Sequence, residues 1–542
     1  MAAPPEPQDH DGPERDHEPR ESVRGGRVME EFSARTRAKN LEAMASEPVD
    51  VLVIGGGIVG AWTALTSALR GHRTALVEKG DFASGTSGKT SRLIHGGLRY
   101  LQQLRVRVVR RAARERDVLL QIAPGLVKPL TFLIPVYRDR GPKKWQLRFG
   151  LWLYDALSKE KTLPRRRWLT PDEAMKREPS LSRTGLVAAA EYADAVTRDA
   201  RLVLAVIRKA SEAGALVANY ARVTELVREG GRVVGALVLD EESGGLSTIR
   251  ATAVVNATGV WVNDLQAEGR KLRLRPTKGI HLLIPRNRIG NRGAVTLPTH
   301  DGRVIFVLPW GELALVGTTD TEHSGAKDDV EATPEDVEYL LNVVNAGFPE
   351  ARSTRADVVA TYAGLRPLID TGETKESGIS REHKIIVDPD GLVTVAGGKL
   401  TTGRAMATQV LWTIENQQFF EVAARHPARV MSDSMQRIQD AREREKTGDT
   451  RSIMLEDAGV AAGATDLGPV VVRAVRHEMA IHVDDVLVRR ADQGGRLASI
   501  VVEAMGANLG WDDGRRAAEL ERYRRIVEAN RRWREGGHDD RP

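Results

Sequence analysis

The chain of 542 residues contains no cysteine. This absence excludes disulfide bonds, thiolate metal sites, redox-active dithiols and covalent flavin attachment through a cysteine thioether. Because proteins without cysteine suit a reducing compartment, the composition favours the cytoplasm.

Long hydrophobic runs are also missing. The chain has no uninterrupted run of about 18 or more apolar residues, the length that a membrane-spanning helix requires. Its N-terminus lacks the apolar segment of a secretory signal. We therefore expect a chain that neither spans a membrane nor leaves by the general secretory route. There is also no internal repeat and no metal-ligand spacing, so no metal site is expected.

The remaining composition is that of a large globular protein, with 41% apolar and 28% charged residues. A length of 542 residues exceeds what one hydrophobic core usually organises, so two or three structural units are expected. The net charge of +6 and the pI near 9.4 favour an anionic partner. Nucleic acid, anionic lipid and a phosphorylated substrate stay open on charge alone.

The N-terminal segment, residues 1–46, has five prolines in its first twenty positions, many charges and almost no apolar residue before Val28. Such a segment cannot offset the entropy lost on ordering. We therefore predict a disordered tail and expect order to begin at Pro48.

A nucleotide-binding motif follows the tail. Val49–Ile54 is a short apolar run suited to a buried strand, and the glycines at 55, 57 and 60 then lead into a helical pattern. These glycines permit a tight turn, close approach of a diphosphate and close helix packing, while the helix N-terminus attracts the phosphates. The residues expected to cradle the nucleotide are Gly55, Gly57, Ile58, Val59 and Gly60.

A second predicted strand, Thr74–Val77, ends in the acidic residue Glu78. The carboxylate can accept hydrogen bonds from ribose hydroxyls and would repel the extra phosphate of NADP. The order of strand, glycines, helix, strand and acid therefore predicts bound FAD or NAD.

The segment Ser84–Leu101 reads SGTSGKTSRLIHGGLRYL. This polar loop of small hydroxyl residues, a His-Gly-Gly turn and an Arg-Tyr pair resembles the flavin-side loop of aerobic FAD-dependent glycerol-3-phosphate dehydrogenases, in the D-amino-acid-oxidase-like superfamily. Further matches occur in family order at residues 256–261, 278–281, 307–310, 317–320, 362–368 and 397–402. The resemblance covers residues 48 to about 415. Two departures are Val59, where the family has asparagine, and Arg92, where lysine is common.

The resemblance implies FAD as cofactor and identifies further residues that contact it. The implied residues are Thr86, Ser87, Ser91, Arg92, Leu93, His95, Gly96, Gly97, Val223, Ala257, Thr258, Gly259, Trp261, Gly364, Arg366, Gly398, Lys399, Leu400 and Thr401. Read without the family, residues 256–259 end a strand with small residues that suit either a close cofactor or a plain turn. Residues 397–402 open a long helix, whose free N–H groups could stabilise negative charge on a reduced flavin ring.

The resemblance also implies a substrate site for sn-glycerol 3-phosphate. Arginine suits a phosphate clamp because its planar fork binds phosphate through two hydrogen bonds. The residues carried over to this site are Arg99, Tyr100, Thr318, Thr319, Arg366 and Lys399, and Arg366 is the cation expected beside the developing alkoxide.

His281 is the first candidate for the base that takes the C2 hydroxyl proton, since an imidazole titrates near neutral pH. Its apolar strand is equally compatible with a satisfied structural histidine. His95 is the alternative base, although its glycine-rich surroundings suggest packing against the flavin. The predicted catalytic residues are therefore His281, Arg366 and Lys399.

A basic segment lies between the two flavin motifs. Trp145, Phe149 and Trp152 recur there at helical spacing beside Lys143, Lys144 and Arg148. The pattern suits a helix lying on anionic lipid, or a core helix with a solvated charged face. Nucleic-acid binding is not expected, because the segment contains no recognisable module. The family's membrane quinone acceptor would make attachment to the inner face of the plasma membrane useful.

The predicted fold class is α/β, a doubly wound Rossmann-like FAD-binding domain with an α+β antiparallel-sheet cap and a C-terminal helical domain. The FAD domain is expected to be discontinuous, over residues 47–125, 186–270 and 355–420. The cap is expected at residues 126–185 and 271–354 and includes a hairpin around residues 309–311, and the helical domain is expected at residues 421–542. The oligomeric state stays open, a homodimer included.

Three functions remain in competition. The motif series favours a quinone-linked glycerol-3-phosphate dehydrogenase. An oxidase of the same fold would pass electrons to oxygen and act on glycerol 3-phosphate or an amino acid, but an amino acid requires no cluster of phosphate-directed cations. A non-catalytic flavin-binding membrane protein would keep the nucleotide turn and show no substrate-dependent flavin reduction.

Overall fold

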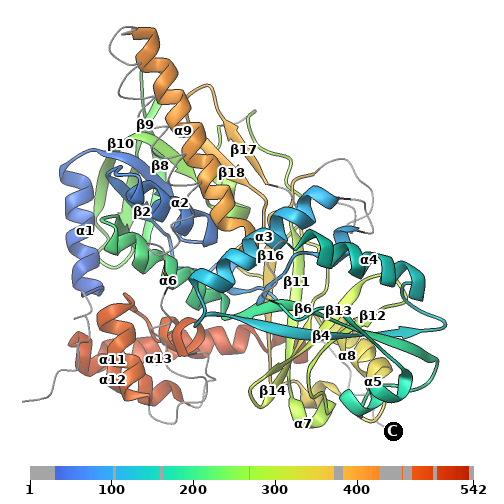
Figure 1. Cartoon of the computed structure of the whole chain (residues 1–542). Coiled ribbons are helices and arrows are strands. Elements are labelled where there is room, and N and C mark those ends of the chain that lie inside the picture. The colour runs from blue at the N-terminus through green and yellow to red at the C-terminus, as the bar shows by residue number, and fades with distance from the viewer. Residues whose placement is uncertain are drawn as a thin grey trace, which may run out of the picture.

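A computed structural model describes residues 31–101, 105–158, 163–267, 269–370, 383–425, 454–455, 467–491 and 497–535. It contains two β-sheets and a C-terminal group of helices (Figure 1). The first 30 residues of the predicted tail lie outside the described residues, as does a helix that the sequence predicts from Met435 to Lys446.

The first sheet carries the nucleotide-binding motif at its centre. Its strands in spatial order are β17 (Lys384–Val387), β18 (Val393–Ala396), β10 (Leu246–Asn256), β1 (Val49–Ile54), β2 (Thr74–Val77) and β7 (Leu216–Ala218). The ladders from β18 through β7 are parallel, and a hairpin of β8 (Ala221–Glu229) and β9 (Arg232–Asp240) extends β10. Because β1 lies between two parallel neighbours, its apolar residues are buried on both faces.

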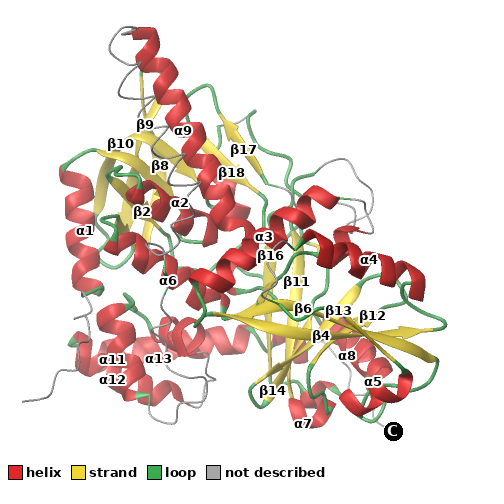
Figure 2. Cartoon of the chain, viewed as in Figure 1, coloured by secondary structure: helices red, strands yellow, loops and turns green. Residues whose placement is uncertain are grey.

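Helices cover this sheet, as Figure 2 shows in red. Helix α2 (Ile58–Leu69) begins directly after the glycine turn and packs against α6 (Asp199–Glu212) and α9 (Gly403–Arg425). Trp62 of α2 is among the largest buried side chains of the core that these helices share with the sheet. The predicted strand-turn-helix-strand unit is therefore confirmed.

The predicted disorder of residues 1–46 is wrong for its last part, because Ala34–Ser46 forms helix α1. Ser33 caps this helix through its hydroxyl, and the few apolar side chains, including Leu41 and Met44, lie on its buried side. Arg37 is also buried, where it donates to the carbonyl oxygens of Asn219 and Tyr220. The average composition concealed these contacts, since a few well-placed side chains are sufficient to dock a short helix.

The second sheet is larger and mostly antiparallel. Its strands in spatial order are β15 (Thr321–Glu322), β11 (Thr277–Pro285), β14 (Leu313–Gly317), β13 (Val304–Trp310), β12 (Ala294–Pro298), β4 (Val127–Tyr137), β6 (Leu186–Thr197) and β3 (Leu93–Ile94). In addition, β16 (Ala360–Arg366) pairs with β11 and β5 (Arg167–Leu169) pairs with β6. The predicted hairpin around residues 309–311 corresponds to β13 and β14, so it is confirmed.

Helices flank this second sheet. Helix α8 (Pro334–Gly347) packs on β11, β13 and β14, and it begins with a capping box in which Thr333 and Asp336 bond each other's backbone amides. The short helices α5 (Pro171–Arg177) and α7 (Arg286–Ile289) lie at the lower end of the second sheet in the view of Figure 1. Helices α3 (Val106–Ile122) and α4 (Lys144–Leu157) contact each other near the junction of the two sheets (Figure 1).

Three predicted domain assignments are wrong. Residues 93–94 were assigned to the FAD domain, but β3 pairs with β6 in the second sheet. Residues 186–197 were assigned to the FAD domain, but β6 pairs with β4 along its whole length in the second sheet. Residues 360–366 were also assigned to the FAD domain, but β16 pairs with β11. Strands β6 and β16 look like FAD-domain strands because both are apolar, and only long-range pairing decides to which sheet such strands belong.

The C-terminal region is helical, as predicted. It contains α11 (Gly468–His477), a π-helix at Asp485–Ala491, α12 (Ala498–Leu509) and α13 (Asp513–Ala529). Buried ion pairs join it to the first sheet, since Arg490 Nη2 donates to Asp81 Oδ1 at 2.9 Å and Arg489 also pairs with Asp81. The α/β fold class with a helical C-terminal domain is confirmed.

No helix within the described residues is long and apolar enough to cross a bilayer. Helix α4 nevertheless presents large apolar side chains to solvent, with exposed fractions of 68% for Trp145, 58% for Phe149 and 52% for Trp152. The core-helix interpretation is therefore wrong for these aromatics, although Leu147 and Leu151 of the same helix are buried.

Candidate active site

The glycine turn between β1 and α2 has the geometry that a dinucleotide needs. Gly55 has a φ of +112°, and a Cβ at this position would lie 2.7 Å from the carbonyl oxygen of Ala257. A Cβ at Gly60 would lie 1.9 Å from the oxygen of Gly55. Only glycine fits at either position, so the turn, helix α2 and the end of β10 can pack closely, as in dinucleotide-binding folds.

Polar groups surround the start of α2, which lies close to the end of β2. The Ile58 N–H donates to Ser87 Oγ at 3.0 Å, so the predicted residues Ile58 and Ser87 meet at the helix N-terminus. Glu78 accepts hydrogen bonds from the Gly56 amide at 2.6 Å and the Gly80 amide at 2.9 Å. Burial raises the pKa of Glu78, while the two amides oppose this shift. The carboxylate thus stands beside the glycine turn, as the ribose interaction requires.

A cavity of about 320 Å³ lies beyond the carboxyl end of β2. It is lined by Lys79, Gly85, Arg222 and Trp261 among others. The Trp261 Nε1 atom is buried without a hydrogen-bond partner in the described structure, and Lys79 lies 4.0 Å above the ring. A buried unpaired donor and a cation beside an aromatic ring suit a nucleotide, so these residues fit the adenosine part of FAD.

The main cavity, of about 890 Å³, is lined by strands of the second sheet, by α4, by the flavin-side loop and by residues 398–401 after β18. It shares Thr86, Lys89 and Gly364 with the smaller cavity. It collects predicted residues from segments far apart in sequence. The predicted residues that line it are Thr86, Ser91, Leu93, His95, Gly97, Tyr100, His281, Thr318, Thr319, Gly364, Arg366, Gly398, Lys399, Leu400 and Thr401. A volume of about 890 Å³ is in the range of small-molecule sites. The main cavity adjoins the smaller cavity and extends from it toward the second sheet.

Arg366, at the end of β16, is held in a fixed position. Its guanidinium donates to Asp320 Oδ1 at 2.9 Å, to Thr318 Oγ1 at 3.0 Å and to the Thr319 carbonyl at 3.0 Å. A Cβ at Gly279 would lie 2.4 Å from Arg366 Nη2, so glycine is needed for the side chain to cross strand β11. The structure thus brings Arg366, Thr318 and Thr319 together, as predicted.

Lys399 and Tyr100 form a second cationic group in the cavity. The Lys399 ammonium lies 3.8 Å from the centroid of the Tyr100 ring, and both pack against the Gly97 turn. The N–H of His95 donates to Thr401 Oγ1 at 3.3 Å, which ties this loop to the start of α9. The side chain of Arg99 lies outside the described part of the structure.

His281 is buried and its ring stacks on Tyr362 with centroids 4.7 Å apart. Its Nε2 is 2.8 Å from Ser91 Oγ, whereas Nδ1 has no hydrogen-bond partner in the described residues. Burial, helped by the charges of Arg366 and Arg92, holds the pKa of His281 well below the usual range of histidine. The ring is therefore neutral at pH 7.

Several predicted cofactor residues lie outside the lining of both cavities. Arg92 has a φ of +59° and stacks 4.1 Å from the Trp310 ring, which explains its place beside His281. Val223 lies in β8, while the small residues 257–259 end β10 beside the glycine turn. The other predicted residues that line neither cavity are Gly55, Gly57, Ile58, Val59, Gly60, Glu78, Ser87 and Gly96.

Sequence reasoning missed several polar residues of the main cavity. Lys89 lies at the junction of the two cavities, where burial and then the charge of Arg489 lower its pKa. Asp320 orients Arg366, and Asp194 lines the cavity from β6. Asp320 belongs to the matched stretch 317–320 but was given no role, whereas Asp194 lies in a long strand with no motif.

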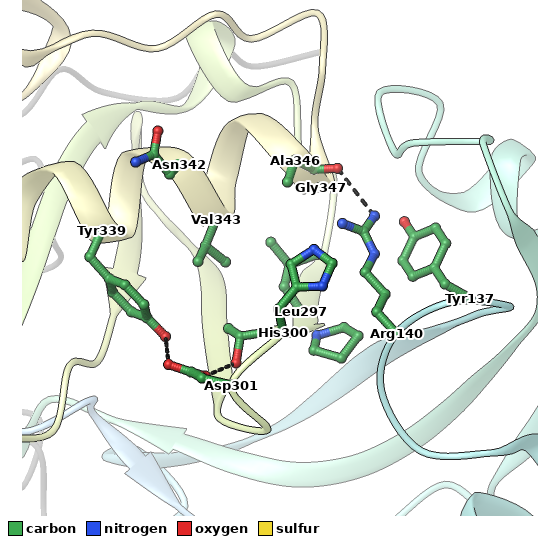
Figure 3. A pocket seen from close by; sticks show the side chains of 12 residues that line it. Tyr137, Arg140, Leu297, His300, Asp301, Tyr339, Asn342, Val343, Ala346 and Gly347 are labelled. Carbon is green, nitrogen blue, oxygen red and sulfur yellow. Dashed lines mark hydrogen bonds between the residues drawn. The ribbon is translucent and has the colours of Figure 1, made fainter.

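A smaller cavity of about 280 Å³ lies outside the site and is drawn in Figure 3. Its walls include Tyr137, Arg140 and Tyr339, and the turn at Pro298–His300 separates it from the main cavity. No residue predicted for the site lines it. This smaller cavity is therefore separate from the predicted site.

Comparison with known proteins agrees with this geometry. The family model described as FAD dependent oxidoreductase matches residues 50–410. Glycerol-3-phosphate dehydrogenase 2 of Mycobacterium tuberculosis is 36% identical over 535 residues, covering 91% of this chain and 90% of that protein. Alpha-glycerophosphate oxidase of Streptococcus pyogenes serotype M1 is 32% identical over 607 residues, covering 92% of this chain and 98% of that protein.

A solved structure also resembles the whole chain. The crystal structure of the glycerol-3-phosphate dehydrogenase from Bacillus halodurans complexed with FAD has a TM-score of 0.69 and 26% sequence identity. The alignment covers 92% of this chain and 98% of that one. Together with the glycine turn and the cavities, these findings identify FAD as the cofactor, and the chain belongs to the family of FAD-dependent oxidoreductases that includes the glycerol-3-phosphate dehydrogenases.

Proposed function

We propose that this protein oxidises sn-glycerol 3-phosphate to dihydroxyacetone phosphate. The observation that carries the proposal is the cavity in which Arg366, Lys399 and His281 converge beside the flavin-side loop. FAD, when bound, supplies the acceptor of the hydride from C2 at flavin N5. The relatives named glycerol-3-phosphate dehydrogenase and alpha-glycerophosphate oxidase support this substrate.

Phosphate recognition is assigned to Lys399, whose ammonium lies over the Tyr100 ring, and to Arg99 as a second cation. The Tyr100 ring restricts the Lys399 ammonium to one position through a cation–π contact. A phosphate carries more negative charge and more acceptor oxygens than the single carboxylate of an amino acid, so it gains more from several cations. This arrangement therefore favours a phosphorylated alcohol over an amino acid.

Arg366 is assigned to the reacting hydroxyl, with Thr318 and Thr319 as its neighbours. Three hydrogen bonds hold its guanidinium, so it can stabilise a developing alkoxide without reorganising during the reaction. Asp320 balances its charge within the site.

His281 is assigned as the base for the C2 hydroxyl proton. Its imidazole is neutral and can therefore accept a proton, while the burial that lowers its pKa disfavours the imidazolium that results. Nε2 lies 2.8 Å from Ser91 Oγ, which also lines the cavity. His95 is the alternative base, since it also lines the cavity.

The electron acceptor is proposed to be a membrane quinone. The main cavity extends to the exposed Trp145 and Phe149 of α4, and the neighbouring helix α3 carries the exposed Arg107, Arg110 and Arg114. Aromatic side chains beside a basic helix suit the interface of an anionic bilayer. We therefore place the protein in the cytoplasm, attached peripherally to the inner face of the plasma membrane.

Oxygen is the competing acceptor, because a relative similar over nearly its full length is named an oxidase. The test begins with anaerobic titration of the purified flavoprotein with glycerol 3-phosphate, glycerol and several D- and L-amino acids. Bleaching of the oxidised flavin band by glycerol 3-phosphate alone is expected. Reoxidation by a soluble quinone analogue that is faster than reoxidation by dissolved oxygen would support the dehydrogenase, and the reverse order would favour the oxidase.

A further inference from the structure

A buried hydrogen-bonded cluster connects the cap to the turn beside the substrate site. The Tyr154 hydroxyl of α4 donates to Asp194 Oδ1 at 2.6 Å and accepts from the Gly96 N–H at 2.9 Å. The same Asp194 oxygen accepts from the Gly96 N–H at 3.2 Å and from Arg116 at 2.6 Å. Two elements, α4 and β6, therefore bond the same backbone amide of the flavin-side loop, and α3 is joined to them through Arg116.

The cluster is shielded from solvent. Arg116, Tyr154 and Asp194 are each at most 2% exposed. Arg116 is further held by Asp117 and donates to the Tyr154 hydroxyl at 3.3 Å. One buried oxygen, Asp194 Oδ1, accepts hydrogen bonds from Tyr154, Arg116 and the Gly96 amide, so the cluster restricts the position of that amide.

The turn that this cluster holds is packed directly against the proposed phosphate-binding group. A Cβ at Gly96 would lie 2.4 Å from the Tyr154 hydroxyl, and a Cβ at Gly97 would lie 2.6 Å from the Tyr100 ring. The same Gly97 Cβ would lie 3.3 Å from Lys399 Nζ. Tyr154, the glycine turn, Tyr100 and Lys399 therefore form one continuous stack, in which a displaced turn displaces the ammonium.

We propose that Tyr154 and Asp194 are positioning residues that set the location of Lys399, and with it the affinity of the site for the substrate phosphate. Neither residue takes part in proton or hydride transfer. This inference rests on the proposed function, because it assigns Lys399 to the phosphate of that substrate.

The expected effect is on KM rather than on kcat. Lys399 contacts the phosphate equally in the bound substrate and in the transition state, so a displaced ammonium weakens both. Replacing Tyr154 by Phe removes one acceptor of the Gly96 amide and one donor to Asp194 and keeps the aromatic ring. We expect KM for glycerol 3-phosphate to rise about tenfold and kcat to stay within about twofold, as the loss of uniform binding predicts.

The matched control is Tyr137→Phe. Tyr137 is also a buried cap tyrosine whose hydroxyl bonds a neighbour, here the Ser182 carbonyl at 3.2 Å, but it does not line the main cavity. Each variant is purified with FAD, its flavin content is measured by absorbance, and its melting temperature is recorded. We expect both substitutions to lower the melting temperature by a similar amount and only Tyr154→Phe to raise KM.

An unchanged KM in folded, flavin-loaded Tyr154→Phe would overturn the proposal, as would an equal rise in Tyr137→Phe. If Tyr154→Phe does not fold, Asp194→Asn serves instead, since it keeps the side-chain shape and weakens the charged hold on the Gly96 amide. A several-fold rise in KM is then expected, and no rise contradicts the assignment.

Binding of inorganic phosphate, followed through the flavin absorption spectrum, tests the role without turnover. We expect about tenfold weaker phosphate binding in Tyr154→Phe than in the wild type, for the same loss of binding free energy. If glycerol 3-phosphate fails to reduce the wild-type flavin, the proposed function fails, while the phosphate titration still decides the positioning role. Equal phosphate affinity in Tyr154→Phe and in the wild type refutes the positioning role.

Discussion

Replacing Gly279 by alanine tests the position of Arg366. A Cβ at residue 279 would lie 2.4 Å from Arg366 Nη2 and 2.6 Å from Thr318 Oγ1. To reach ordinary contact near 3.4 Å, the guanidinium has to move by about 1 Å. A displacement of about 1 Å in a positioning group can cost about 100-fold in rate. We therefore expect flavin reduction at saturating glycerol 3-phosphate to slow by about two orders of magnitude.

The effect on stability is expected to be much smaller. The clash involves the ends of two side chains rather than the backbone, and alanine in a strand offsets part of the cost because glycine loses more entropy on folding. Anaerobic stopped-flow absorbance measures the rate, and thermal unfolding measures the stability. Gly514→Ala is the control, because its Cβ would meet no atom closer than 3.5 Å. A wild-type rate in Gly279→Ala would refute the reasoning.

Two further predictions concern stability and membrane contact. Although burial disfavours the charged ring of His482, hydrogen bonds with Glu242 and Glu519 raise its pKa to about 9. This stabilisation is complete below the unfolded pKa near 6.5 and is lost as pH rises through about 9. The free energy of unfolding should therefore depend less on pH between pH 6 and 9.5 in His482→Gln than in the wild type. An identical pH dependence in the two proteins contradicts this. Replacing Trp145, Phe149 and Trp152 together by alanine should reduce co-sedimentation with anionic vesicles at least severalfold, because it removes apolar area that can enter the bilayer interface. Unchanged co-sedimentation, with flavin content intact, would exclude this face of α4.

The sequence predicted the nucleotide-binding unit well because its determinants are local. Strand β1, the glycines at 55, 57 and 60, helix α2 and Glu78 follow one another within one short stretch of chain. Each has a steric or electrostatic requirement that the residue type alone reveals. Ser87, which lies 29 residues beyond Ile58, was implied by the family resemblance and not by local geometry.

The sequence failed where pairing over long distances decides the structure. Strand β6 belongs to the second sheet because of its register with β4, which no local pattern indicates. Helix α1 is docked by Arg37, whose partners lie more than 180 residues away. Asp194 and Tyr154 meet Gly96 only in the folded protein, so their place beside the site could not be read from spacing.

The aromatics of α4 show a different limit. Helical spacing placed Trp145, Phe149 and Trp152 on one face, but it could not say whether that face points inward. In the structure, the buried face of α4 is formed by Leu147, Leu151 and Tyr154, so the aromatic face is left to solvent.

The most direct test of the account is reduction of the bound flavin by substrate. Purified protein is titrated anaerobically with glycerol 3-phosphate, and glycerol and amino acids serve as comparisons, while the oxidised flavin band is followed. The account predicts bleaching by glycerol 3-phosphate alone, because the cavity joins a flavin site to phosphate-directed cations. Bleaching by an amino acid but not by glycerol 3-phosphate would contradict it, and so would a flavin that none of these compounds reduces.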